Sequence, residues 1–214
     1  MLKAPWKHAE FCVVDLETTG LDLRRDAIVS YGAVVVSEGR VRVATSAYAI
    51  VRPDCAVSVP AVRTHNLRDI DLAEAPRGPE ALAGLVEMLK GRILVAHAAW
   101  IEHSFLTRAL RESRVQLTGP VVDTARLARA AGVGRAAPGH EPPLELVAES
   151  LGLEPHGPHH ALGDALTTAE VFLVLATRLS SRSAETAGSL AREPVADLPS
   201  PREEQLQMLR RLRR

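Results

Sequence analysis

Residues 11–20 decide the fold, and they read Phe11-Cys12-Val13-Val14-Asp15-Leu16-Glu17-Thr18-Thr19-Gly20. The apolar run that opens this stretch predicts a buried strand, and the strand closes on Asp15 and Glu17. Side chains alternate between the two faces of a strand, so these two carboxylates share one face. Two like charges side by side raise each other's pKa unless a cation lies between them. A divalent metal explains the pair; the alternative is a core strand whose last residues emerge into water.

The segments after this strand extend it into a sheet. The turn at residues 18–20 is followed by an apolar run from Ala27 to Val36, which can return as an antiparallel neighbour. Residues 41–51 alternate well enough for a third strand. Residues 54–78 carry no strong period, and a helix is expected from Pro79 to about Lys90. The apolar run at residues 92–96 then predicts a strand that enters the sheet by a crossover, parallel to its neighbour.

Two helices carry acidic residues on their apolar sides. The segment from Trp100 to Glu112 has helical spacing, and Glu102 lies on its apolar stripe. A carboxylate aimed at a core is costly without a partner, whereas one aimed at a metal cleft is not; the alternative is that Glu102 reaches solvent at the edge of the stripe. The longest helix starts after Pro158 and ends near Leu179, and Asp164 points at packed protein. His159 converges on Asp164 only if it lies in an extended lead-in before the helix.

The remaining segments are shorter. Residues 121–124 predict an extended piece followed by a helix to Ala131, with Asp123 as its N-cap. Residues 132–143 form a loop, and Leu144–Leu151 form a short helix that Gly152 ends. From Ser180 the composition turns to Ser, Ala, Glu, Arg and Pro, so we expect one domain over residues 1–180 and a mobile tail over 181–214, with a possible last helix at 203–213.

The composition limits the class of protein. A chain of 214 residues with 46% hydrophobic and 24% charged residues suits one globular domain with an appendage. Its formal net charge is zero, so a nucleic-acid partner must be held locally rather than by a global basic field. Two cysteines, Cys12 and Cys55, favour a reducing compartment over a disulfide scaffold. No apolar stretch approaches membrane-spanning length, and a cytoplasmic protein is therefore expected.

The inward acidic side chains, together with a histidine, predict a two-metal site. Too many charges point inward for a structural explanation, namely Asp15, Glu17, Glu102, Asp164 and His159. Two divalent ions about 3.5–4 Å apart, Mg²⁺ or Mn²⁺, activate a water and stabilise the leaving oxygen of a phosphodiester. A histidine is the natural general base for that water.

On these residues the chain resembles the DEDDh-type 3′→5′ exonucleases, which include polymerase proofreading subunits and oligoribonucleases. The resemblance covers about residues 10–179 and rests on the segments at 14–20, 95–106 and 159–165. It implies an α/β fold of the ribonuclease-H-like type, in which a three-stranded antiparallel meander joins parallel strands in one mixed sheet flanked by helices. It implies hydrolysis from the 3′ end of single-stranded nucleic acid, with DNA favoured, in replication or repair. A polymerase or another protein could dock on the C-terminal tail.

The resemblance also implies roles for individual residues. Asp15 would bridge both metals, Glu17 and Asp164 would complete the tighter site, and Glu102 would act mainly through metal-bound water. His159, not His160, fills the position of the base. Positions that contact the terminal nucleotide are matched by Leu21, His65 and Ile101, with backbone amides offered by Thr18 and Thr19. The middle motif departs from the family, because Ala98 replaces the usual Asn and Glu102 replaces the usual Asp. One additional methylene is tolerable, whereas loss of the Asn hydrogen bond affects the surroundings of the metal.

Other readings of the sequence stay open. A zinc site could use the histidines at 156, 159 and 160, although no thiolate or ordered His-x-x-x-His accompanies them. A Ser-His-Asp hydrolase lacks its Gly-x-Ser-x-Gly turn. An oligoribonuclease-like RNA exonuclease fits the same motifs. A catalytically impaired exonuclease fold, retained as a polymerase-associated or binding subunit, is the rival from another class.

Overall fold

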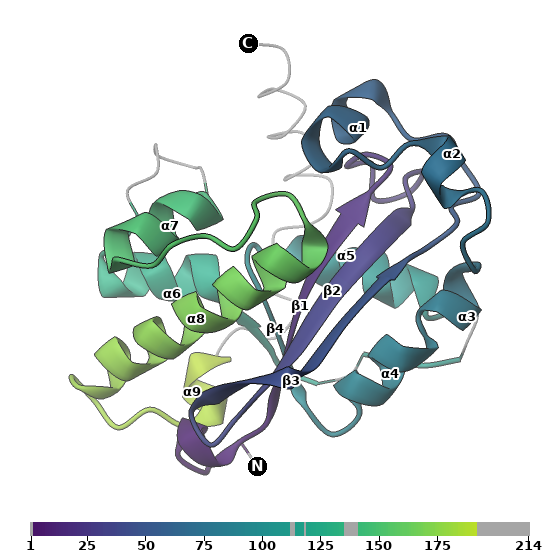
Figure 1. The fold of residues 1–214 in the computed structure, drawn as a ribbon. Coiled ribbons are helices and arrows are strands. Elements are labelled where there is room, and N and C mark those ends of the chain that lie inside the picture. Colours follow the sequence, from purple (N-terminus) through teal and green to yellow (C-terminus); the bar gives the residue numbers. More distant parts are fainter. Residues whose placement is uncertain (1, 112–113, 118, 135–140, 192–214) are drawn as a thin grey trace.

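The computed structural model describes residues 2–111, 114–117, 119–134 and 141–191, and its centre is a five-stranded mixed sheet (Figure 1). The strands lie in the order β3-β2-β1-β4-β5. Their bounds are Phe11–Thr18 for β1, Ile28–Ser37 for β2, Arg40–Ile50 for β3, Ile93–Ala96 for β4 and Val121–Asp123 for β5. The first three strands form an antiparallel meander, and β4 and β5 add in parallel to β1. The predicted ribonuclease-H-like mixed sheet is therefore confirmed.

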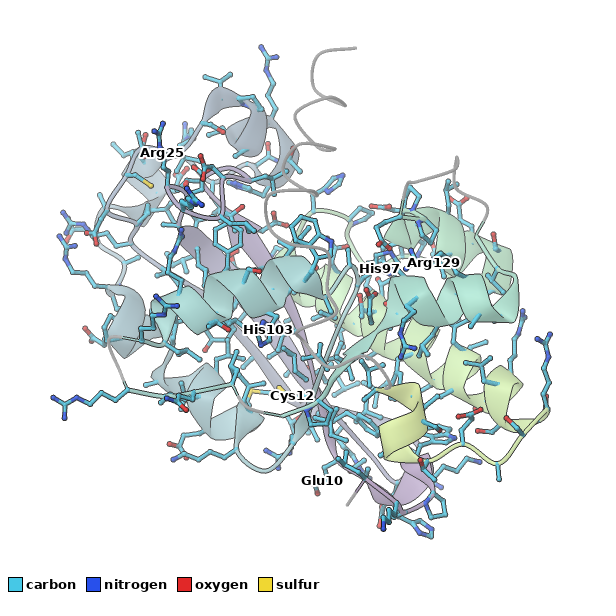
Figure 2. The ribbon with its side chains drawn as sticks, turned by 180° about the vertical axis from the view of Figure 1, so that it is seen from behind. Glu10, Cys12, Arg25, His97, His103 and Arg129 are labelled. Atoms are coloured by element: carbon cyan, nitrogen blue, oxygen red, sulfur yellow. The ribbon has the colours of Figure 1, made fainter. Side chains whose placement is uncertain are left out.

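Helices cover both faces of the sheet. One face carries α6 (Thr124–Ala131), α7 (Leu144–Leu151) and the long α8 (Ala161–Ser180), which packs on β1, β2 and β3. The other face carries α4 (Ala83–Leu89) and α5 (Trp100–Ala109), seen from behind in Figure 2.

The side chains of β1 alternate between two hydrophobic clusters. Phe11 and Val13 belong to the cluster under α8, whereas Cys12 and Val14 belong to the cluster under α4 and α5. Continuing this alternation assigns Asp15 to the α8 face. The period of two in the first strand thus determines which helix faces the carboxylates.

The connection between the meander and β4 contains helices that the sequence pattern did not show. Residues 54–78, which carry no strong period, contain α1 (Val59–His65) and α2 (Asp69–Leu72). The helix expected over 79–90 is divided at Leu82 into α3 (Gly78–Ala81) and α4. The ends of such short helices are determined by their capping residues, and the helices are too short to show a clear apolar period in the sequence. For α1 the caps are Ser58, whose hydroxyl accepts from the Ala61 amide, and Asn66 in the left-handed conformation.

The body extends beyond residue 180, so the expected start of the tail at 181 is wrong for the described part. Helix α9 (Ala187–Leu190) is buried in the α8-side cluster and contacts η1 (Trp6–His8). The indole Nε1 of Trp6 donates to the Ser180 hydroxyl at 2.8 Å, and Trp6 stacks edge-on against Phe172. The Ser- and Ala-rich composition of this segment had indicated a tail rather than a packed helix. The expected helix at 203–213 lies outside the described residues.

Within the described ranges, none of the helices has the length and apolar character needed to cross a membrane.

Candidate active site

Three carboxylates converge where β1 ends and α8 begins. Asp15 and Glu17 come from β1, and Asp164 comes from the first turn of α8. One oxygen from each of the three lies within 4.8 Å of the other two. Oxygen ligands at this spacing suit a hard divalent cation such as Mg²⁺. The structure therefore brings together the strand pair and the helical carboxylate that the sequence indicated.

Two glycines allow α8 to come this close to the sheet. Gly32 on β2 pairs with Asp15, and a Cβ built on it would lie 2.2 Å from backbone atoms of Ala161. A Cβ on Gly163 would lie 1.7 Å from the carbonyl oxygen of His156. Only glycine fits such close backbone approaches. The analysis of the sequence did not identify Gly32; its signal was a single glycine inside an otherwise apolar strand.

His159 and His160 have different surroundings. His159 has a φ of 62°, so the lead-in to α8 is left-handed at this residue rather than extended as expected. Its amide donates to Oδ2 of Asp164 at 2.9 Å, and its side chain is exposed. The ring of His160 stacks on Tyr48 of β3, with centroids 4.6 Å apart. The stack occupies His160, which favours His159 as the histidine available to a ligand.

Glu102 lies inside the protein, so the solvent-edge reading is wrong. Its side chain is only 4% exposed, and its Oε2 finds no hydrogen-bond partner within the described residues. Burial raises the pKa of Glu102 well above its usual range, and the charges of Asp123 and Glu17 raise it further. A buried carboxylate with an unpaired oxygen is costly unless a cation or a bound water satisfies it.

The three clustered carboxylates share this electrostatic strain. Burial raises the pKa of Asp15 well above its usual range, and the charges of Glu102, Asp164 and Glu17 raise it further. Burial raises the pKa of Glu17 to about 8, and the Asp164 charge adds to the effect. The pKa of Asp164 rises to about 6, mainly through burial, although the His159 amide opposes the shift. Divalent cations would reverse these shifts, so the residues fit the metal site that the family implies.

Glu145 is an acidic residue that the sequence reasoning missed. It lies in the first turn of α7, and its charge contributes to the raised pKa of both Asp15 and Asp164. The signal in the sequence was weak, because a Glu in the first turn of a helix is also explained by the helix dipole.

The turn after β1 is already hydrogen-bonded, which corrects the expected role of Thr19. Its amide donates to the Ala27 carbonyl at 2.9 Å, and its hydroxyl donates to Asp26 at 2.8 Å. The Thr18 hydroxyl donates to the Gly20 carbonyl at 2.6 Å. The Thr19 amide is therefore not free for a nucleotide, and these bonds instead hold the turn in shape.

The other expected nucleotide contacts are His65, Leu21 and Ile101. His65 is buried, its Nε2 lies 3.1 Å from the Thr18 carbonyl, and its Nδ1 accepts from the Leu67 amide at 3.1 Å. Since a carbonyl only accepts, Nε2 carries the proton and the ring is neutral. Burial lowers the pKa of His65, which agrees with that state. Leu21 is exposed and Ile101 is half-buried, so both have surface to offer an apolar ligand.

The zinc alternative does not match the arrangement. His156 pairs with Glu170 at 3.1 Å, and His160 stacks on Tyr48. In the part of the chain that the structure describes, the side chains with metal-ligand spacing are Asp15, Glu17 and Asp164. Oxygen-only ligands are typical of Mg²⁺ or Mn²⁺ rather than of a structural zinc site.

The sequence matches a known protein family and several of its members. Residues 12–172 match the family model RNase_T, described as "Exonuclease". The DNA polymerase III subunit epsilon of Treponema pallidum is 32% identical over 172 residues, which are 79% of this chain and 77% of that protein. A DNA polymerase III subunit epsilon-like protein of Rhodobacter capsulatus is 33% identical over 197 residues, which are 90% of this chain and 27% of the longer relative.

Solved structures share the fold. Exonuclease X, crystallised with a 5′-overhanging duplex DNA, superposes with a TM-score of 0.65 and 24% identity, covering 85% of this chain and 97% of the other. E. coli Exonuclease I in complex with a dT13 oligonucleotide superposes with a TM-score of 0.70 and 15% identity, covering 82% and 42%. The fold, the motifs and the match over residues 12–172 agree, and the chain belongs to the RNase_T exonuclease family.

Proposed function

We propose that this chain removes nucleotides from the 3′ end of single-stranded DNA with two divalent ions, Mg²⁺ or Mn²⁺. The observation that carries the proposal is the convergence of Asp15, Glu17 and Asp164 within 4.8 Å, beside a buried Glu102 with an unpaired oxygen. The acidic groups of such a set repel one another when ionised, and cations between them would remove this repulsion. Loss of a Thr19 amide contact does not weaken this part of the argument, because the metal ligands are side chains.

Each acidic residue has a distinct task in this proposal. Asp15 would hold both ions, and Glu17 and Asp164 would complete the tighter of the two sites. Glu102, which is not among the carboxylates that lie within 4.8 Å of one another, would act through water bound to the second ion. When bound, the ions supply a more acidic water and stabilise negative charge on the leaving oxygen.

His159 is the general base of the proposed reaction. Its side chain is exposed, and its backbone amide donates to Oδ2 of Asp164 at 2.9 Å. Histidine suits the transfer of a proton near neutral pH. Leu21 and Ile101 offer apolar contacts to the terminal base, while His65 supports the Thr18 carbonyl and shapes the turn.

The similarity to polymerase III epsilon subunits favours DNA as the substrate and a polymerase as partner. That partner would place the enzyme in DNA replication or repair. The free thiols of Cys12 and Cys55 fit the cytoplasm. The proposed docking of the partner on the C-terminal tail concerns residues outside the described ranges.

A digestion series tests the proposal. Matched 5′-labelled DNA and RNA oligonucleotides, and a circular single-stranded DNA, are incubated with Mg²⁺, Mn²⁺ or EDTA. We expect a ladder of single-nucleotide losses from DNA with either metal, none with EDTA, and an intact circle. Glu17→Gln should abolish the ladder, whereas Glu87→Gln, at an exposed Glu on α4, should not.

Four results would contradict the proposal. Cleavage in EDTA would exclude the metal mechanism, and efficient nicking of the circle would exclude a pocket that grips an end. Faster shortening of RNA than of DNA would favour the oligoribonuclease-like alternative. A wild-type protein that binds the labelled strand without shortening it would favour an impaired subunit.

A further inference from the structure

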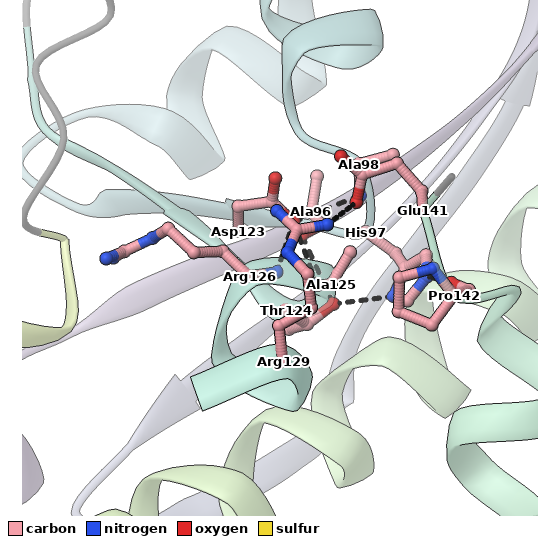
Figure 3. A network of polar contacts seen from close by, with 10 residues as sticks. All are labelled: Ala96, His97, Ala98, Asp123, Thr124, Ala125, Arg126, Arg129, Glu141 and Pro142. Atoms are coloured by element: carbon pink, nitrogen blue, oxygen red, sulfur yellow. Dashed lines mark hydrogen bonds and ion pairs between the residues drawn. The ribbon is translucent and has the colours of Figure 1, made fainter. Parts of the chain in front are cut away.

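His97 connects three segments that are distant in sequence, and Figure 3 shows how they meet. It directly follows β4, its Nδ1 lies 2.9 Å from the hydroxyl of Thr124 at the start of α6, and its Nε2 lies 2.7 Å from the carbonyl of Pro142. Pro142 stands just before α7. One side chain therefore joins the end of β4 to the starts of two helices.

The acceptor on one side of the ring fixes one proton. The Pro142 carbonyl can only accept, so Nε2 of His97 donates. The Thr124 hydroxyl lies 2.9 Å from Nδ1 and also donates to the Ala96 carbonyl at 3.3 Å. Replacing the ring would therefore remove the 2.7 Å bond to the Pro142 carbonyl and the 2.9 Å bond to the Thr124 hydroxyl.

Asp123 forms a second connection to the same turn. Its Oδ1 accepts from the amides of Ala125 at 2.8 Å and Arg126 at 3.4 Å, as expected of the N-cap of α6. The same oxygen accepts from the amide of Ala98 at 3.2 Å. The sequence predicted the cap and did not predict this bond to the turn after β4.

The turn held in this way determines where Glu102 lies. Ala98 has a φ of 55°, a left-handed conformation that alanine rarely adopts, and its carbonyl accepts from the Ile101 amide at 3.0 Å. Helix α5 begins at Trp100, and Glu102 is in its first turn. A turn that is strained at Ala98 needs outside bonds to keep one geometry.

The same network holds the start of α7. Arg129 on α6 pairs with Glu141 at 2.6 Å, beside the bond from His97 to Pro142. Glu145 follows in the first turn of α7. The turn that leads to Glu102 and the segment that leads into α7 therefore depend on one set of hydrogen bonds.

We propose that His97 and Asp123 are positioning residues for the metal site, because their hydrogen bonds fix the turn that places Glu102 and the segment that leads into α7. This inference rests on the proposed function, in which Glu102 acts on the second ion. Neither residue touches the substrate in this proposal, and removing them changes how tightly the site holds its metal.

The experiment measures metal binding and activity on the same variants of the full chain. His97→Ala and Asp123→Ala should raise the Mn²⁺ concentration that gives half of the maximal thermal stabilisation by about 10–100-fold, the usual effect of losing a partner that orients metal ligands. The Mg²⁺ concentration for half-maximal nuclease activity should rise in parallel. His97→Gln keeps an amide donor for Pro142, and Asp123→Asn keeps the accepting oxygen, so both should recover most of the affinity.

Two controls separate positioning from general stability. Thr186→Ala removes the cap of α9 at the far side of the body and should lower the melting temperature without changing the metal concentrations. His8→Ala removes an exposed histidine before β1 and should change neither. If His97→Ala and Asp123→Ala behave like Thr186→Ala, the positioning role is wrong. If instead wild type shows no metal dependence in either assay, the proposed function itself fails.

Discussion

The backbone amide of His159 donates to the Oδ2 atom of Asp164 at 2.9 Å, so the residue proposed as base and a residue proposed as metal ligand are fixed to each other. Five residues separate them in sequence, and the left-handed φ of 62° at His159 makes the contact possible. Asp164 is the fourth residue of α8, and its own amide donates to the His160 carbonyl at 2.9 Å. Hydrogen bonds thus connect the lead-in to the first turn of the helix.

The first prediction separates the two adjacent histidines. His159→Ala should lower kcat by about 10²–10⁴-fold, the usual effect of removing a general base, and should remove the acid limb of the pH profile. His160→Ala should have a much smaller effect, because that ring stacks on Tyr48. Initial rates on a 3′-end substrate between pH 5 and 9 measure both. Equal losses in the two variants would show that the base is assigned to the wrong residue.

The second prediction concerns stability in metal-free buffer. Burial raises the pKa of Glu17 from an ordinary value of 4.5 to about 8, and that of Asp164 from 3.8 to about 6. The folded protein therefore retains protons that the unfolded chain releases, and this stabilisation is complete below about pH 4 and lost as the pH rises through 6 and 8. The melting temperature in EDTA should fall over that range, by about 2–4 °C for each kcal/mol lost.

A variant and a metal addition test whether the carboxylates cause this fall in melting temperature. Glu17→Gln should flatten the fall between pH 6 and 8, and saturating Mg²⁺ should restore the melting temperature of wild type at pH 8 but not that of the variant. A wild-type protein that is more stable at pH 8 than at pH 5 without metal would contradict the proposed arrangement of carboxylates.

The third prediction uses the strain at Ala98. Ala98→Gly should stabilise the protein by about 0.5–1 kcal/mol, because glycine adopts a positive φ without the cost that alanine bears. Ala98→Asn should also stabilise it, since Asn tolerates the left-handed conformation. Urea denaturation at a fixed Mg²⁺ concentration measures both changes, and Ala99→Gly, at the next and buried position, is a control that should destabilise. A loss of stability in Ala98→Gly would show that this φ is not a source of strain.

The fourth prediction tests the close approach of α8 to the sheet. Gly32→Ala would place a Cβ 2.2 Å from the Ala161 backbone, so α8 must shift away from β2. We expect a loss of about 1–3 kcal/mol in stability and a weaker response of the melting temperature to Mn²⁺, since Asp164 moves with the helix. Gly91→Ala also replaces a glycine and meets no atom within 4 Å, although its positive φ carries a strain of its own. An unaltered metal response in Gly32→Ala would contradict the role of this contact.

The fifth prediction defines the C-terminal limit of the folded body. A chain cut after Ala191 should keep the nuclease activity and melting temperature of the full chain, because it retains the buried Ala187, Leu190 and Ala191. A chain cut after Ser180 loses the buried Ala187 and Leu190 and should melt at a lower temperature. Thermal melts and the digestion assay on both truncations check this limit. Equal melting temperatures would restore the boundary expected from composition.

The sequence by itself determined the strand that carries Asp15 and Glu17, the inward face of Glu102, and the cap formed by Asp123. Each of these depends on a local period or on a neighbouring amide, which are properties of a short segment. The family match and the mixed sheet followed from the same motifs. The sequence also indicated that His159 converges on Asp164 only outside the helix, although the left-handed turn was not foreseen.

Only the tertiary structure decided how these segments meet. The need for glycine at position 32 is seen only in the structure, where the backbone of Ala161 lies against it. The Thr19 amide is unavailable to a ligand because it donates to the Ala27 carbonyl. His97 joins residues 27 and 45 positions away, and no local pattern encodes such bonds. Helix α9 contacts η1 and is buried in the hydrophobic cluster that contains Trp6 and Phe172, whereas composition alone suggested a tail. Contacts between distant segments depend on shape and on which polar atoms are left unpaired, and a one-dimensional pattern contains neither.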